Sequence, residues 1–315
     1  MAEPEPNQAS WKPDPVVAQK RSGSPGSTGG GVPQRAGVAT RPDRAAAAEP
    51  VEIDISVPHA SRMYDYLLGG TDNFAVDREA VERASAAVGG IDNARADVRA
   101  NRAFLGRAVR YLAGDAGIRQ FLDIGTGIPN PDNVHGVAQA TAPATRIVYV
   151  DNDPVVLAHA HTLLNSTPQG TTAYVSCDLR NPDTILDRAA ATLDFTQPVA
   201  LILAAILHLI SDRDQPHRIV ERLVEALPSG SYLAISHLSA DIQPDAMAEL
   251  ARRLNQTARE TFVMRTHAQI TCFFDGLDLV EPGVVQVDHW RPPTPKVTTS
   301  RGWIPSLYGA VGRKP

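Results

Sequence analysis

FLDIGTGIP, at residues 121–129, joins an apolar run to a glycine turn and carries an aspartate two residues before the first glycine. The apolar residues predict the end of a buried strand, while Gly125 and Gly127 allow the backbone to turn sharply and to approach a ligand that any Cβ would exclude. Asp123 is then expected to face the ligand that fills the turn. This stretch predicts a nucleoside-binding loop.

A dinucleotide-binding loop would need a third glycine, in the pattern G-x-G-x-x-G, where this chain has Asn130. The carboxylate of Asp123 also repels phosphate and pairs with an ammonium group. The loop therefore favours a ligand that has an amino group near the turn and no phosphates.

Short apolar runs alternate with segments of helical periodicity from residue 120 onward, which is typical of a parallel sheet with helices on both faces. We expect strands at 120–124, 146–151, 172–176, 199–204 and 231–236. Helices are expected between them, at 132–140, 154–165, 182–191 and 215–227. Two later segments, 278–287 and 307–311, are expected to be strands that close one edge of the sheet.

Three amphipathic segments precede the sheet and predict a helical cap over residues 56–117. The first ends at Gly69, the second covers residues 77–88, and the third begins after Asn93. Residues 118–315 would then form the α/β domain that binds the ligand.

The N-terminal segment differs in composition from the rest of the chain. The first fifty residues hold eight of the 25 prolines and a single aromatic residue, Trp11. Such a segment buries too little apolar surface to offset the entropy of ordering it. We therefore expect residues 1–55 to be a disordered tail rich in proline and glycine.

Charge and hydropathy exclude several classes of partner. Beyond the first fifty residues the chain has 24 basic and 30 acidic residues, which argues against a nucleic-acid substrate. The longest apolar run, 199–210, is too short to span a membrane, and the acidic N-terminus lacks the features of a secretory signal. Cys177 and Cys272 show no metal-ligand spacing. We expect a cytoplasmic protein that binds neither membrane nor metal.

Aspartates recur at the ends of the predicted strands. Asp151 ends the run IVYVD, 26 residues after Gly125, where a carboxylate can accept both hydroxyls of a ribose. Asp178 ends AYVSCD, where it can accept the exocyclic amine of an adenine while the backbone N–H of Leu179 faces a ring nitrogen. One such aspartate is usually a helix cap or a turn residue. Three of them after a glycine loop indicate one crevice at the carboxyl ends of the strands.

The series DIGTG, VDNDP and CDL resembles the motifs of class I S-adenosylmethionine-dependent methyltransferases. The chain is still more similar to a bacterial group of these proteins with no assigned methyl acceptor, over residues 56–315, through RMYDYLLGGTDNFAVDR, RANRAFLGRAVRYL and FFDGLDLVEPGVV. The resemblance implies a Rossmann-like, mostly parallel sheet with an antiparallel edge strand, and S-adenosylmethionine as cofactor.

By that resemblance, residues of the three motifs hold successive parts of the cofactor. The methionine part would be held by Asp123, Gly125 and Gly127, the ribose by Asp151 with Asn152 beside it, and the adenine by Asp178 and Leu179. The chain departs from many class I enzymes in having Pro129 where they have a third glycine. A different course of this loop, with Asp132 capping the next helix, is therefore expected.

His208 is the leading candidate for a general base, because AAILHLI leaves the fourth strand where the methyl group is expected. The alternative is that His208 bonds a backbone group in a buried turn. His237 is the second candidate. His159 and His161 are two apart on a helix and cannot face one metal ion.

The cap carries more polar and aromatic side chains than packing requires. Arg102 is the candidate partner of the cofactor carboxylate, and its alternative is an ordinary exposed helix arginine. Tyr66 is expected to line the acceptor pocket together with His208. The other cap residues of this kind are Tyr64, Asn73, Arg95 and Asn101.

The sequence thus predicts a methyltransferase that acts on a small molecule under a helical lid. Two alternatives stay open: a nicotinamide-dependent oxidoreductase on the same fold, and a cofactor-binding sensor or partner-binding protein without catalysis. Asp123, the missing third glycine and the lack of a Tyr-x-x-x-Lys pair argue against the first. The sequence does not specify the acceptor or the oligomeric state.

Overall fold

The computed structural model describes residues 54–130, 132–159, 166–293 and 304–315. These belong to one compact unit, Pro50–Pro315. The predicted tail lies almost wholly outside the described residues, so its disorder stays a prediction.

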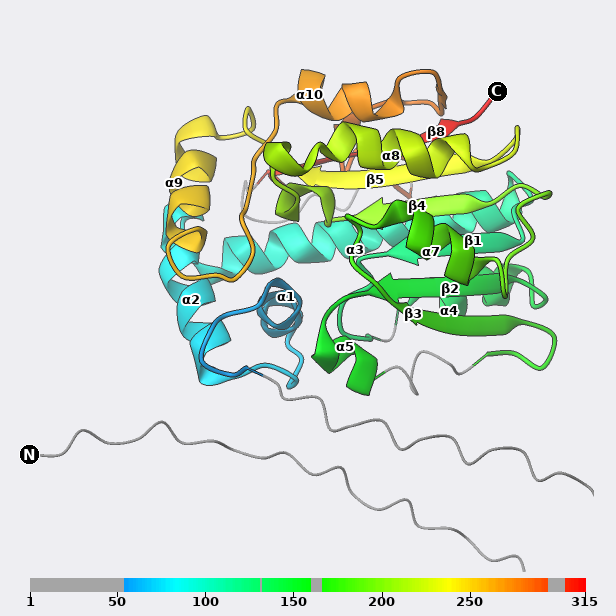
Figure 1. The fold of residues 1–315 in the computed structure, drawn as a ribbon. Coiled ribbons are helices and arrows are strands. Elements are labelled where there is room, and N and C mark those ends of the chain that lie inside the picture. The colour runs from blue at the N-terminus through cyan, green and yellow to red at the C-terminus, as the bar shows by residue number, and fades with distance from the viewer. Residues whose placement is uncertain (1–53, 131, 160–165, 294–303) are drawn as a thin grey trace, which may run out of the picture. The chain divides into compact units, whose positions relative to one another are not determined.

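The sheet confirms the predicted fold (Figure 1). Its five parallel strands lie in the order β3-β2-β1-β4-β5, and β8, which is antiparallel to β5, continues the sheet. β2 and β4 lie on either side of β1, so the order in which strands are added to the sheet reverses at β1. Ligands of such sheets bind at this point. The strands are β1 (Gln120–Ile124), β2 (Arg146–Asp151), β3 (Thr171–Ser176), β4 (Ala200–Ala204), β5 (Tyr232–Leu238), β6 (Asp278–Leu279), β7 (Val285–Gln286) and β8 (Leu307–Arg313).

The helices agree with the prediction up to β5 and exceed it afterwards. Residues 160–165 of the predicted helix 154–165 lie outside the described residues. Two helices after β5 were not expected. The α-helices are α1 (Ala60–Leu68), α2 (Ala75–Ser85), α3 (Ile91–Gly114), α4 (Val134–Thr141), α5 (Pro154–Ala158), α7 (Pro182–Ala189), α8 (Pro216–Glu225), α9 (Pro244–Leu254) and α10 (His267–Thr271). Short 3-10 turns are η1 (Ala86–Val88), η2 (Leu207–Leu209), η3 (Asp212–Asp214) and η4 (Cys272–Phe274).

Alternation along the strands divides the core into two layers, one on each face of the sheet. In β1, Leu122 packs with α7 and α8 on one face, whereas Phe121 packs with α3 and α4 on the other. Both side chains are completely buried. The sheet is therefore covered on both faces, as its apolar strands predict.

A third cluster lies beyond the carboxyl ends of the strands, where α1, α2 and α9 meet (Figure 1). The second half of α3 packs on the sheet in the same core layer as β1. The packing is therefore continuous across residue 117, where the predicted cap ends. Within the described ranges, no helix is both long and apolar enough to cross a membrane.

Candidate functional site

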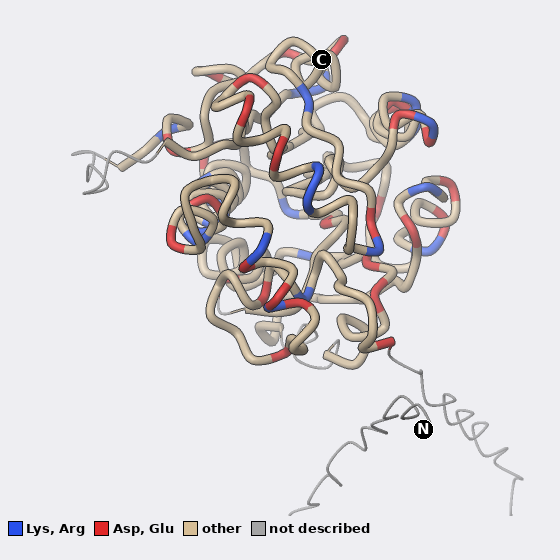
Figure 2. Tube along the Cα trace, turned by 90° about the vertical axis from the view of Figure 1, so that its left-hand side faces the viewer, with Lys and Arg blue, Asp and Glu red and all other residues tan. Residues whose placement is uncertain are grey.

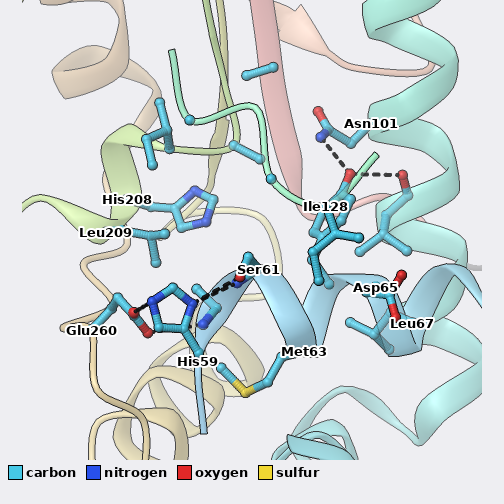
Figure 3. Close-up of a pocket in the computed structure, with 18 of the residues that line it drawn as sticks. His59, Ser61, Met63, Asp65, Leu67, Asn101, Ile128, His208, Leu209 and Glu260 are labelled. Atoms are coloured by element: carbon cyan, nitrogen blue, oxygen red, sulfur yellow. Dashed lines mark hydrogen bonds and ion pairs between the residues drawn. The ribbon is translucent and has the colours of Figure 1, made fainter. Parts of the chain in front are cut away.

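A cavity of about 520 Å³ lies between the carboxyl ends of the strands and the cap. Its lining comes from the glycine loop, from the ends of β2, β3 and β4, and from α1, α3 and α9 (Figure 3). This volume is in the range of pockets that hold drug-sized ligands. All the residues predicted for the cofactor line it.

The two glycines of the loop have different roles. Both have positive φ, 77° at Gly125 and 66° at Gly127, a conformation that glycine adopts without strain. A Cβ at Gly125 would come within 2.5 Å of Ile206, so this glycine lets the loop pack against the segment after β4. At Gly127, apart from the glycine itself and its two chain neighbours, no atom of the described residues lies within 4 Å of that position. Only Gly127 therefore leaves space for a ligand.

Asp123, one residue before the end of β1, carries a buried carboxyl group. Burial raises its pKa to about 7, and the nearby charge of Asp151 adds to the rise, while Arg102 opposes it. A cation placed beside this carboxyl group would stabilise its ionised form. The group therefore suits a ligand that carries an ammonium.

Asp151, the residue expected to hold the ribose, also fixes the glycine loop through a backbone hydrogen bond. One carboxylate oxygen accepts a hydrogen bond from the Gly127 N–H at 2.8 Å, and the other accepts from the Asp153 N–H at 2.9 Å. Burial raises its pKa, which these two bonds oppose. Because a carboxylate offers about four lone-pair positions, Asp151 retains capacity for a ribose hydroxyl.

Asp178, Asn152 and Leu179 lie together at the β3 end of the cavity. The Asn152 side chain donates to Asp178 at 2.8 Å, and the Arg180 guanidinium pairs with Asp178 at 3.0 Å. Leu179 packs into the core below. The structure thus brings together the three residues predicted near the adenosine.

Two polar atoms on α3 are buried against the cavity without a hydrogen-bond partner among the described residues, Oδ1 of Asn101 and Nε of Arg102. The rest of each side chain is fixed: Asn101 donates to the Tyr64 hydroxyl at 2.9 Å (Figure 3), and Arg102 donates to Asn130 at 2.7 Å. Buried polar atoms are normally paired. They therefore present one acceptor and one donor to a ligand.

The loop after Pro129 differs from the expectation at Asp132. The N-cap of α4 is Asn133, whose side chain accepts from the Asn130 N–H at 3.2 Å. The backbone carbonyl of Asp132 instead accepts a hydrogen bond from Arg102. Asp132 therefore ties the loop to α3 and does not cap α4.

His208, in η2, is 6% exposed and lines the cavity (Figure 3). Its ring stacks on Phe262 with the ring centres 6.0 Å apart, and its Nδ1 is buried without a partner among the described residues. Burial, assisted by the charge of Arg265, lowers its pKa to about 3. The ring is therefore neutral and keeps a free polar atom.

His237, the second candidate base, does not line the cavity. The Arg265 guanidinium donates to its Nε2 at 2.9 Å, so Nδ1 carries the proton and donates to the Leu238 carbonyl at 2.7 Å. Arg265 also donates to the carbonyls of Leu207 and Ile210. It thereby holds the turn that carries His208, a role with no local signal in the sequence.

Tyr66 does not line the cavity either, contrary to the expectation. Its hydroxyl donates to Glu82 of α2 at 2.8 Å, and its ring lies near Arg95. Tyr64 lines the cavity instead, because two positions along a helix are rotated by about 200°.

A partly buried ion cluster, here called the His59 clamp, joins the cap to the sheet and was not expected from the sequence. The His59 ring contacts Asp153 at 3.0 Å. It also contacts Glu260 at 2.8 Å (Figure 3). Ser61 also donates to Asp153. Burial alone would lower the pKa of His59, but the hydrogen bonds to both carboxylates raise it to about 9. His59 is therefore a cation that bridges two anions at the rim of the cavity.

Among the described residues, no three His, Cys, Asp or Glu side chains are grouped to hold a metal ion. His159 pairs with Asp72 at 3.4 Å. His161 lies outside the described residues.

Comparisons with known proteins were made on both sequence and structure. The family model described as S-adenosyl methyltransferase matches residues 46–315. A DUF574 family protein from Streptomyces avermitilis is similar, with 47% identity over 83% of this chain and 99% of that one and a TM-score of 0.78. A proposed methyltransferase from Thermobifida fusca has 38% identity over 85% of this chain and 99% of that one, with a TM-score of 0.76. No curated protein matches the chain.

Proposed function

We propose that this chain, which belongs to the S-adenosyl methyltransferase family, methylates a small molecule bound beneath its cap. The family match confirms the predicted class and its cofactor, S-adenosylmethionine. The observation that carries the proposal is the pair of unpartnered buried atoms on α3 beside the open space at Gly127. The residues present therefore fit the cofactor.

The amino-acid end of the cofactor is assigned to the region between α3 and the glycine loop. The Oδ1 of Asn101 and the carboxyl group of Asp123 are the acceptors for its ammonium, and the Nε of Arg102 is the donor for its carboxylate. Charge-assisted hydrogen bonds of this kind are stronger than neutral ones. Asn101 thus joins the residues predicted from the sequence.

The adenosine is assigned to the ends of β2 and β3. Asp151 and Asn152 would bind the ribose, and Asp178 with Leu179 would bind the adenine. These residues and the amino-acid end together are called the cofactor side. Its support is that the sheet brings all of them to one cavity.

When bound, S-adenosylmethionine supplies an electrophilic methyl group: the acceptor's lone pair forms the new bond, the C–S electron pair stays on sulfur, and the acceptor's proton is released. The enclosed cavity excludes water and orients the acceptor. The Nδ1 of His208 is unpaired among the described residues and can hydrogen-bond the acceptor, but a pKa of about 3 makes the ring a weak base, so we assign His208 to orienting the acceptor. Tyr66 is not assigned a catalytic role.

A small acceptor is supported by the charge distribution as well as by the cavity. Seen from the cap side, Lys and Arg residues are dispersed among Asp and Glu residues (Figure 2). Proteins that bind nucleic acids usually gather basic residues into a patch or stripe.

Two measurements test the function. A saturating concentration of S-adenosylhomocysteine, about 100 times its Kd, should stabilise the protein by about 2.7 kcal/mol, whereas NAD should not raise its Tm. Methyl-labelled S-adenosylmethionine is then incubated with the protein and a bacterial extract. Label is expected among molecules below about 1 kDa, the size of ligands that such pockets enclose. A larger shift with NAD, label only in macromolecules, or no label at all would each contradict the proposal.

A further inference from the structure

One part of the cavity is lined almost wholly by apolar side chains. These belong both to the cavity lining and to the third hydrophobic cluster, and they come from α1, η2, the end of β5, α9 and the loop after α9. We call six of them the acceptor wall: Met63, Leu209, Leu238, Leu250, Leu254 and Phe262. The glycine loop and the strand-end aspartates are not part of it.

The ring of His208 brings an unpaired polar atom to this wall. His208 stacks on Phe262 of the wall, and His208 and Leu209 extend from η2 toward the cavity (Figure 3). The Nδ1 of His208 is buried and has no partner among the described residues. An apolar ligand that offers one hydrogen-bonding group would satisfy this atom, and an apolar ligand without one would not.

The cations of the lining are engaged elsewhere. Arg102 is bonded to Asn130, and Arg180 pairs with Asp178 and with Asp214 at 3.1 Å. Within the described part of the lining there is no other Lys or Arg. An anionic acceptor would therefore lie against the wall without a counter-charge from the protein, which is costly in an apolar site.

The carboxylates near the wall are engaged as well. Asp97 accepts a hydrogen bond from the Ser306 N–H at 3.1 Å. Glu260 is paired with the His59 cation and accepts from the Ala60 N–H at 3.0 Å. A cationic acceptor would have to compete with these bonds, so a neutral one is favoured.

We propose that the acceptor wall and the Nδ1 of His208 form the binding site of a neutral, largely apolar alcohol or phenol whose hydroxyl bonds to that nitrogen. The assignment rests on the proposed function, since it takes the ligand to be the methyl acceptor. The cavity of about 520 Å³ also has to hold the cofactor, so the acceptor is compact.

The test uses 2-naphthol as a neutral probe and 2-naphthoate as its anionic counterpart, both titrated into the full chain saturated with S-adenosylhomocysteine. We expect 2-naphthol to bind and 2-naphthoate to bind at least about tenfold more weakly, because the anion finds no counter-charge. Equal binding of the two probes would overturn the assignment.

Two variants locate the probe. Leu250→Glu adds a charge to the wall and should weaken 2-naphthol binding at least about tenfold while the affinity for S-adenosylhomocysteine stays within about threefold. The matched control is Leu279→Glu, at an exposed leucine outside the cavity, which should change neither affinity. His208→Phe keeps the apolar volume and should weaken 2-naphthol about two- to tenfold but not naphthalene, since only one hydrogen bond is lost.

The outcomes separate this assignment from the function on which it rests. Binding of S-adenosylhomocysteine without 2-naphthol, or an unchanged 2-naphthol affinity in Leu250→Glu, would overturn the assignment alone. Failure of S-adenosylhomocysteine to bind the wild-type chain would overturn the proposed function, and the assignment with it. Unchanged S-adenosylhomocysteine binding in the variants also shows that they are folded.

Discussion

The cofactor side and the acceptor wall share one cavity but are built differently. On the cofactor side Asp123, Asp151 and Asp178 stand at or just beyond the ends of adjacent parallel strands, so the sheet fixes their spacing. The acceptor wall is assembled from helices and loops that are far apart in the sequence. It is tied to the sheet through Arg265 and the His59 clamp. In the proposed site the sheet therefore determines the cofactor side, whereas helices and loops of the cap and of the later chain together determine the acceptor wall.

The largest effect on this division is expected from Arg265→Met. The change leaves His237 and the carbonyls of Leu207 and Ile210 without their donor. Since each buried unpaired group costs about 1–3 kcal/mol, the free energy of unfolding should fall by about 3 kcal/mol or more. Urea denaturation measures it. Arg213→Met, at an exposed position in η3, is the control and should cost little; equal losses in the two variants would contradict the role given to Arg265.

Asp151→Ala probes the cofactor side. It removes the acceptor of the Gly127 N–H and the proposed ribose contact. Hydrogen bonds to a charged group contribute about 1.5–3 kcal/mol, so the affinity for S-adenosylhomocysteine should fall about 10- to 100-fold. Calorimetry measures this affinity. The control is Asp183→Ala, at an exposed position of α7. An unchanged Kd would show that Asp151 holds no part of the cofactor.

The His59 clamp should make the attachment of the cap depend on pH. The pKa of His59 is about 9 in the folded protein and about 6.5 when unfolded. A raised folded pKa gives stability that is fully present below pH 6.5 and is lost as pH rises through 9. At pH 6 the free energy of unfolding of the wild type should exceed that of His59→Gln by roughly 1–2 kcal/mol. This difference should shrink by pH 10. Urea denaturation at both pH values tests this, and a difference that grows with pH would refute it.

The smallest effects are expected from substitutions of Tyr66 and Tyr64, which lie two positions apart in α1. Tyr66→Phe loses only an exposed hydrogen bond to Glu82 and should change the stability by less than about 0.5 kcal/mol, with no change in ligand binding. Tyr64→Phe removes the buried hydroxyl that orients Asn101 and should weaken S-adenosylhomocysteine binding about two- to tenfold. Calorimetry on both variants compares them; the reverse order would restore Tyr66 to the site.

Local patterns predicted the sheet and the cofactor side because both depend on short stretches of sequence. The bounds of β1 and β2 were predicted to the residue, since the apolar run of β1 ends at a glycine turn and that of β2 ends at an aspartate. Once the strands were placed, Asp123, Asp151 and Asp178 had to meet at one edge. Cytoplasmic location and the roles of individual residues stay predictions.

The cap could be predicted only in outline. Met247, Leu250 and Leu254 of α9 have helical spacing, a signal that was present in the sequence but not used. His59 and Glu260 are about two hundred positions apart, and no local pattern relates them. Tyr66 was misplaced because helical periodicity shows which residues share a face but not which neighbour that face contacts.

In the proposed site the buried carboxyl group of Asp123 would couple cofactor binding to proton exchange. With a pKa of about 7, this group is partly protonated in the free protein at neutral pH. An ammonium placed beside it favours the ionised form, so binding releases part of a proton to the solvent. The measured heat then includes the ionisation of the buffer, and the affinity rises with pH up to about 7 and levels off above it. The pH of the surroundings would in this way set how fully the protein is loaded with cofactor.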